Sequence, residues 1–142
     1  MGISRLFVYG TLLKGESNHE RFCGDALTIE PAVTTGLLYH LPYGFPAMFD
    51  TLAGQVFGEV MTFTDIKRTL ERLDMLEGYR PNGDSHYIRI SKPVTILKEG
   101  RTTTAWVYVY PESRLEEIRR VGVAVPDGQW SNFVSRRDVV TA

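Results

Sequence analysis

The feature that most constrains this chain is a short apolar run, Leu6–Val8, which is followed by Gly10 and then by a polar segment. Phe7 and Val8 are aromatic and β-branched residues that strands favour, so the run predicts a strand near the N-terminus. Gly10 removes the Cβ that would block a sharp turn or the close approach of a ligand. The strand therefore leads into a loop whose backbone N–H groups are suited to binding an anion or a developing oxyanion.

A comparison with nucleotide-binding loops limits the kinds of ligand that this loop could bind. The segment from Gly10 to Ser17 has the spacing of a P-loop, but Glu16 occupies the position of the phosphate-neutralising lysine. A carboxylate there would repel a nucleotide. Two interpretations remain: a turn at a strand end without a ligand, or a loop that offers N–H donors to an uncharged or singly charged group.

Length and charge indicate one domain with a small partner. The chain has 142 residues, 16 of them basic and 17 acidic, with a net charge of −1. This length is enough for one hydrophobic core, so residues 1–142 are predicted to form a single domain. The balanced charge, without a basic block, argues against nucleic acid and a membrane surface as partners. Nothing in the sequence specifies an oligomeric state.

The cysteine content and hydropathy favour a cytoplasmic location. Cys23 is the only cysteine, which excludes an intrachain disulfide and a thiolate metal site. No apolar stretch reaches the roughly 18 residues that a membrane span needs, and the N-terminus lacks an apolar signal core. A reducing cytoplasm is therefore expected.

The clearest helix is predicted over Asp65–Glu77. Thr64 offers an N-cap hydroxyl, Asp65 places an acid in the first turn, and Gly78 is suited to end the helix. The apolar stripe of this helix consists of Ile66, Leu70 and Leu73.

Glu77 falls in the middle of the same stripe. A carboxylate that faces inward costs several kcal/mol unless it is paired, hydrogen-bonded or protonated. In one interpretation the helix frays early and Glu77 reaches water, or it pairs with Arg89. In the other, Glu77 is a general base in a partly apolar pocket, where burial raises its pKa toward the working range.

The remaining pattern is dominated by strands. Gly54–Phe63 reads as a central strand in which Glu59 points either inward or to solvent at a strand end. Trp106, Tyr108 and Tyr110 share one strand face, which favours core or barrel wall over a ligand platform. The other predicted elements are strands at Gly36–Leu41 and Tyr87–Ile90, a hairpin joining Val94–Leu97 to Thr102–Tyr110, short helices at Asn18–Phe22 and Glu112–Arg120, a loop at Thr28–Thr35 broken by Pro31, an aromatic loop at Pro42–Ala47 that walls a pocket, a turn-rich loop at Tyr79–Ser85, and a turn at Pro126–Trp130.

Many strands with one long central helix favour an α+β fold. We expect a small mixed β-barrel or a strongly curved sheet with a few flanking helices, since a doubly wound fold would need more helices.

The inventory of reactive side chains is small. His19, His40 and His86 are far apart and lack the spacing of a helical zinc pair, so no metal is expected. Cys23 and the serines lack a nucleophile motif, and no cofactor is indicated. One inward acid and one donor loop suffice when the substrate carries its own amine nucleophile. Intramolecular attack of that kind can supply about 7–11 kcal/mol.

At these positions the chain resembles the γ-glutamyl cyclotransferase-like family, particularly its γ-glutamylamine cyclotransferase branch. The family's Tyr-Gly-Ser/Thr-Leu loop and its Leu-Asp-x-x-Glu segment are both matched. The matching residues are Tyr9-Gly10-Thr11-Leu12, Lys14-Gly15, Asn18-His19, Gly44-Phe45-Pro46-Ala47, Gly58-Glu59-Val60, Leu73-Asp74-Met75-Leu76-Glu77 and Tyr87-Ile88-Arg89.

The resemblance implies a small barrel and a transferase- or lyase-type enzyme that releases 5-oxoproline from a small γ-glutamyl amide without a cofactor. Substrate would bind at Tyr9, Gly10, Thr11 and Leu12, with Glu77 as the proton shuttle. Tyr87 would shape the pocket, and Arg89 would orient Glu77 or the substrate carboxylate. The alternative is a catalytically silent binding module on the same fold.

Overall fold

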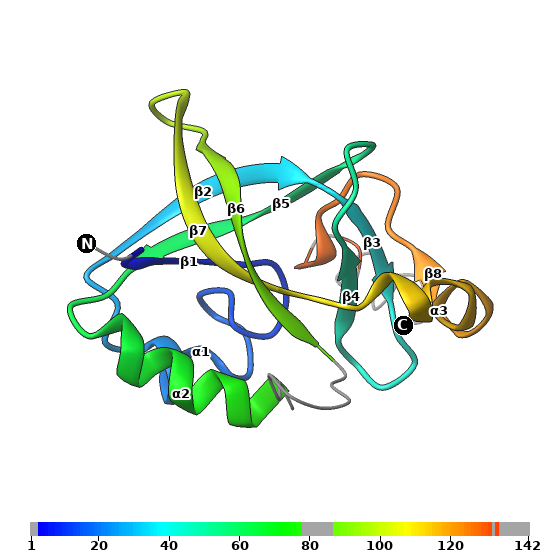
Figure 1. Ribbon diagram of the computed structural model, residues 1–142, viewed down its shortest axis with the longest axis horizontal. Coiled ribbons are helices and arrows are strands. Elements are labelled where there is room, and N and C mark those ends of the chain that lie inside the picture. Colours follow the sequence, from blue (N-terminus) through cyan, green and yellow to red (C-terminus); the bar gives the residue numbers. More distant parts are fainter. Residues whose placement is uncertain (1–2, 78–86, 132, 134–142) are drawn as a thin grey trace.

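A computed structural model describes residues 3–77, 87–131 and 133 of the chain. Figure 1 shows a barrel with helices α1 and α2 on one side and a small second sheet, flanked by α3, at the other end. The strands are β1 (Arg5–Val8), β2 (Thr28–Thr35), β3 (Leu37–His40), β4 (Pro46–Phe49), β5 (Gln55–Thr62), β6 (Ile88–Ile96), β7 (Arg101–Val109) and β8 (Val123–Ala124). The helices are α1 (His19–Cys23), α2 (Ile66–Glu77) and α3 (Leu115–Val121), with a 3₁₀ turn at Glu112–Arg114.

The barrel closes in the strand order β1-β5-β2-β6-β7. Its neighbours pair antiparallel except β1 and β7, which pair in parallel at Leu6 and Trp106 and close the ring. The remaining strands form a sheet in the order β4-β3-β8. The predicted α+β fold with a small mixed barrel is confirmed.

Strand alternation divides the core into two clusters. One cluster takes residues from all five barrel strands, including Phe7 of β1 and Val60 of β5, and therefore fills the barrel interior. The other takes the alternate residues, including Leu6 and Met61, and packs them against Leu73 of α2. The four residues of β1 thus serve both clusters.

One predicted loop is wrong, and a second is wrong in part. Thr28–Thr35 is the strand β2, which pairs with β5 along its whole length. Pro31 is tolerated because it lies at the end of the short pairing between β2 and β6, where an N–H is dispensable. Its carbonyl faces β6 and accepts a hydrogen bond from the Leu97 N–H at 3.0 Å. In the aromatic segment, Pro46 already begins β4 and pairs with His40.

Helix α2 is N-capped by Asp65 rather than by Thr64. The Asp65 Oδ1 accepts from the Arg68 N–H at 3.2 Å, and the Asp65 carbonyl accepts from the Thr69 N–H at 3.3 Å. The helix ends at Glu77 as expected. Gly78, the predicted loop Tyr79–Ser85 and His86 lie outside the described residues.

The predicted strands, hairpin and short helices elsewhere are present with small shifts in their bounds. β6 is one continuous strand that joins the two segments predicted separately. The C-terminal part returns to the core, because β8 pairs with β3 and Trp130 is 4% exposed. No helix in the described part of the chain is long and apolar enough to cross a membrane.

The cap of α2 can be tested by substitution. Asp65→Ala removes the acceptor of the Arg68 N–H and should lower the free energy of unfolding by about 1 kcal/mol. Denaturant unfolding followed by circular dichroism measures this loss. Thr64→Ala is the matched control and should change stability by less than about 0.5 kcal/mol; a larger loss for Thr64→Ala than for Asp65→Ala would assign the cap to Thr64.

Candidate active site

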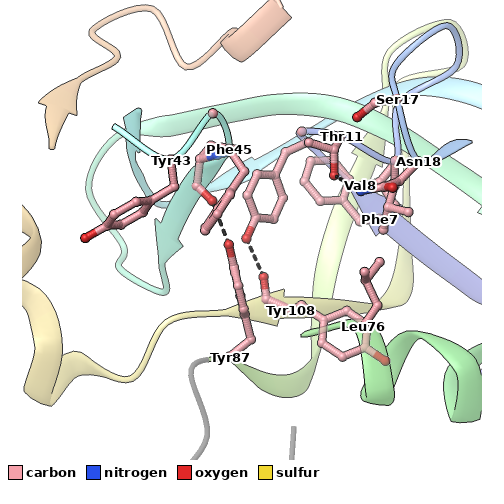
Figure 2. A pocket seen from close by; sticks show the side chains of 15 residues that line it. Phe7, Val8, Thr11, Ser17, Asn18, Tyr43, Phe45, Leu76, Tyr87 and Tyr108 are labelled. Atoms are coloured by element: carbon pink, nitrogen blue, oxygen red, sulfur yellow. Dashed lines mark hydrogen bonds between the residues drawn. The ribbon is translucent and has the colours of Figure 1, made fainter. Parts of the chain in front are cut away.

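A pocket of about 360 Å³ opens where the end of β1, the segment before β4, the end of α2 and the start of β6 meet. Figure 2 shows its side chains, which come from segments far apart in the sequence. Its lining consists of Phe7, Val8, Tyr9, Gly10, Thr11, Leu12, Ser17, Asn18, Tyr43, Gly44, Phe45, Pro46, Leu76, Tyr87 and Tyr108. The volume is within the range of small-molecule sites.

The loop after β1 forms one side of this pocket. The N–H of Leu13 bonds to the carbonyl of Gly10 at 3.0 Å, and the N–H of Asn18 bonds to the carbonyl of Thr11 at 2.9 Å. The Asn18 side-chain amide also donates to the Thr11 hydroxyl at 3.0 Å. Among the hydrogen bonds within the described residues, none uses the N–H groups of Thr11 and Leu12. Both residues line the pocket, so these two N–H groups are candidate donors to a ligand there.

Glu59 of β5 holds this loop in place. Its side-chain Oε1 accepts from the Lys14 N–H at 2.8 Å, and the residue is half-buried. The two alternatives drawn from the sequence, an inward acid or a solvent position at a strand end, both miss this backbone contact. His19 adds a second tie, because its Nδ1 lies 3.0 Å from the Leu12 carbonyl oxygen.

Gly10 is required by its protein neighbour. A Cβ at this position would lie 2.6 Å from Cγ and 2.7 Å from Cδ of Pro46, so only glycine fits without movement. From the sequence, the glycine at position 10 was attributed to a sharp turn or to the close approach of a ligand. In the structure the close neighbour is the Pro46 ring on the facing wall of the pocket.

Tyr9 and Tyr87 are both fixed by their hydroxyl groups, and Figure 2 shows the position of Tyr87. The Tyr9 hydroxyl donates to the Tyr108 carbonyl at 2.6 Å, and the Tyr87 hydroxyl donates to the Pro46 carbonyl at 2.9 Å. The Tyr87 ring also packs edge-on against Tyr110, with ring centroids 4.5 Å apart. The two rings therefore form rigid walls of the pocket.

The C-terminal turn of α2 reaches the pocket through Leu76, which lines it. Glu77 is the next and last residue of the helix. Its side chain lies outside the described residues, so the predicted position of this carboxylate stays a prediction. At the level of the backbone, the fold brings the donor loop and the end of α2 to one pocket.

Asp74 holds that turn of the helix against the barrel. It accepts a hydrogen bond from the Tyr108 hydroxyl, with 2.5 Å between the oxygens, and its second oxygen lies 3.7 Å from Arg89 Nη2. The Arg89 guanidinium also lies over the Trp106 ring, 5.0 Å from the centroid. Arg89 thus contacts Asp74 and is absent from the described lining of the pocket.

The similarity of this chain to known proteins agrees with the geometry of the pocket. Residues 6–132 match the family described as "Gamma-glutamyl cyclotransferase, AIG2-like". The chain belongs to this family. It is an enzyme of the cyclotransferase type, and the resemblance seen in the sequence is confirmed.

Two relatives and one solved structure illustrate the similarity. The "Gamma-L-glutamyl-butirosin B gamma-glutamyl cyclotransferase" of Niallia circulans is 34% identical over 115 residues, covering 80% of this chain and 71% of the relative. A Methanocaldococcus jannaschii protein named "Putative gamma-glutamylcyclotransferase" is 32% identical over 135 residues, covering 90% of this chain and 96% of the relative. The crystal structure of YkqA from Bacillus subtilis has a TM-score of 0.66 and 25% identity; the match covers 94% of this chain but only 42% of YkqA.

Tyr108, which lines the pocket of this cyclotransferase, and Asp74, which accepts its hydrogen bond, were not identified from the sequence. Tyr108 was placed in an aromatic stripe of core or barrel wall, where it does pack, but it also lines the pocket. Asp74 lies one helical turn before Glu77, a spacing that puts both on one helix face and could have identified it. Tyr43 and Phe45 confirm that the aromatic loop walls a pocket.

The tie between Tyr108 and Asp74 should stabilise the cyclotransferase measurably. Tyr108→Phe removes a donor to a half-buried carboxylate and should lower the free energy of unfolding by about 1–3 kcal/mol. Thermal or denaturant unfolding measures the change. Tyr43 is 68% exposed, so Tyr43→Phe is the matched control and should unfold like the wild type. Equal stability of Tyr108→Phe and wild type would show that the contact contributes nothing.

Cys23 should be chemically inert in the folded enzyme. Burial, reinforced by the nearby Asp25 carboxylate, raises the pKa of the Cys23 thiol to about 12, so the reactive thiolate is scarce at neutral pH. Labelling by a thiol reagent at pH 8 should be more than about a hundredfold slower in the native state than in denaturant. Comparable rates in the two conditions would contradict this.

Proposed function

We propose that this enzyme converts a γ-glutamyl amide into 5-oxoproline and a free amine. The α-amine nitrogen of the substrate attacks its own γ-carbonyl carbon, forming the ring C–N bond. The bond from that carbon to the leaving nitrogen then breaks, and the proton lost by the α-amine goes to the leaving nitrogen. No water, metal or cofactor enters this balance. The single cysteine of the chain agrees with a reducing, cytoplasmic setting.

The donor loop supplies the stabilisation of charge. The tetrahedral intermediate carries an oxyanion on the former γ-carbonyl oxygen, and the N–H groups of Thr11 and Leu12 are donors suited to it. Tyr9 and Gly10 complete this side of the site, and Tyr87 holds the substrate from the facing wall. Because the loop is tied to Glu59 and Asn18, its donors need little reorganisation during the reaction.

Glu77 is the proposed proton shuttle. It would take a proton from the α-amine and return it to the leaving amine. The observation that carries this proposal is that Leu76, its neighbour in the chain, lines the same pocket as the loop. Arg89 would contribute indirectly, since it contacts Asp74 in the same turn of α2.

The relatives support the class of substrate. The name of the Niallia circulans relative specifies a γ-L-glutamyl derivative of butirosin B, which fits cleavage of a γ-glutamyl bond. A pocket of about 360 Å³ is suited to a molecule of metabolite size.

The test is release of 5-oxoproline from γ-glutamyl-lysine, γ-glutamyl-alanine and glutathione. Wild type should release it from at least one of them, and Glu77→Gln should reduce kcat by about 10²–10⁴-fold, because the amide keeps the shape of the side chain but takes no proton. Glu71→Gln, an exposed acid on the same helix, is the matched control and should retain full activity. Turnover by Glu77→Gln within a few-fold of wild type would remove Glu77 from the mechanism.

A further inference from the structure

The pocket has two walls of different chemistry. Figure 2 shows Thr11, Ser17 and Asn18 on one side, and Tyr43, Phe45 and Tyr87 on the other. The first side offers hydroxyl, amide and backbone N–H groups. The second, which we call the aromatic wall, consists of Tyr43, Phe45 and Tyr87.

The aromatic wall is held in a defined shape. The Leu41 N–H bonds to the Phe45 carbonyl at 3.0 Å, and the Gly44 N–H bonds to the Leu41 carbonyl at 3.2 Å, which makes a tight turn. Gly44 adopts a φ of +94°, a conformation that favours glycine, and so allows the turn to present the residues on both sides of it. The Tyr43 and Phe45 rings lie 5.8 Å apart and 32° from parallel.

The aromatic wall presents the surfaces of aromatic rings to a ligand and carries little charge. The Tyr87 hydroxyl donates to the Pro46 carbonyl, and Tyr87 lines the pocket. Tyr43 is 68% exposed, which leaves a large aromatic surface at the mouth of the pocket. None of the described residues that line the pocket carries a charged side chain. A carboxylate placed against this wall would lose water without gaining an ionic partner.

The pocket also has more room than a γ-glutamyl group requires. That group has nine non-hydrogen atoms and occupies at most roughly 270 Å³, if each takes the roughly 30 Å³ that a water molecule occupies in the liquid. The pocket holds about 360 Å³ and is open to solvent at Tyr43. With the glutamyl group against the donor loop, the remaining space borders the aromatic wall.

We infer that the aromatic wall is the subsite for the leaving amine, and that the preferred substrates are γ-glutamyl amides whose amine half is apolar or aromatic. This inference rests on the proposed function, since it concerns the second half of the same substrate. Stacking on Tyr43 and Phe45 would favour a ring over a short chain.

The experiment compares γ-glutamyl-benzylamide, γ-glutamyl-methylamide and γ-glutamyl-glycine by kcat/KM for release of 5-oxoproline. The benzylamide should exceed each of the others by about tenfold or more. Tyr43→Ala should reduce the ratio of benzylamide to methylamide about fivefold. Leu52→Ala, which truncates a side chain that is 95% exposed and outside the pocket lining, is the matched control and should leave the ratio unchanged.

The outcomes separate the two proposals. Release of 5-oxoproline from all three amides with equal kcat/KM, or a preference for the glycine adduct, would overturn the subsite while the proposed function stands. A benzylamide preference that Tyr43→Ala does not change would overturn the assignment of this wall. No release from any amide would overturn the proposed function and the subsite with it.

Discussion

The site depends on the way β1 is held in the barrel. This strand has four residues, yet it pairs with β5 on one side and closes the ring against β7 on the other. Because alternate residues of a strand point to opposite faces, Phe7 fills the barrel and Leu6 packs under α2. The strand cannot shift by one residue without exchanging these two environments. The loop that follows it therefore starts from a fixed position.

The second half of the site is held from the opposite side. Helix α2 packs on the barrel through Leu70 and Leu73, but these apolar contacts alone would allow its last turn to fray. The hydrogen bond from Tyr108 to Asp74 and the contact with Arg89 join that turn to β7 and β6. Barrel closure positions the donor loop, and this polar cluster positions the end of the helix.

The sequence allowed the parts of the fold with local signals to be predicted. β1, the turn after it and α2 carry clear strand, glycine and helix patterns, and motif order identified the family. Pro31 led to the wrong prediction of a loop at Thr28–Thr35. Whether a strand tolerates a proline there depends on how far β6 extends along β2, which the local sequence does not show. Tyr108 could not be joined to the pocket because barrel closure brings it there from a distant segment. The role of Pro46 against Gly10 was hidden for the same reason.

We propose that the loop after β1 and the end of α2 act on one ligand. Titration of 5-oxoproline into ¹⁵N-labelled protein, followed through the backbone amide resonances, tests it most directly. We expect the largest shifts on Thr11 and Leu12 and on the last turn of α2. Shifts confined to other parts of the barrel, with both of these segments unmoved at saturation, would contradict it.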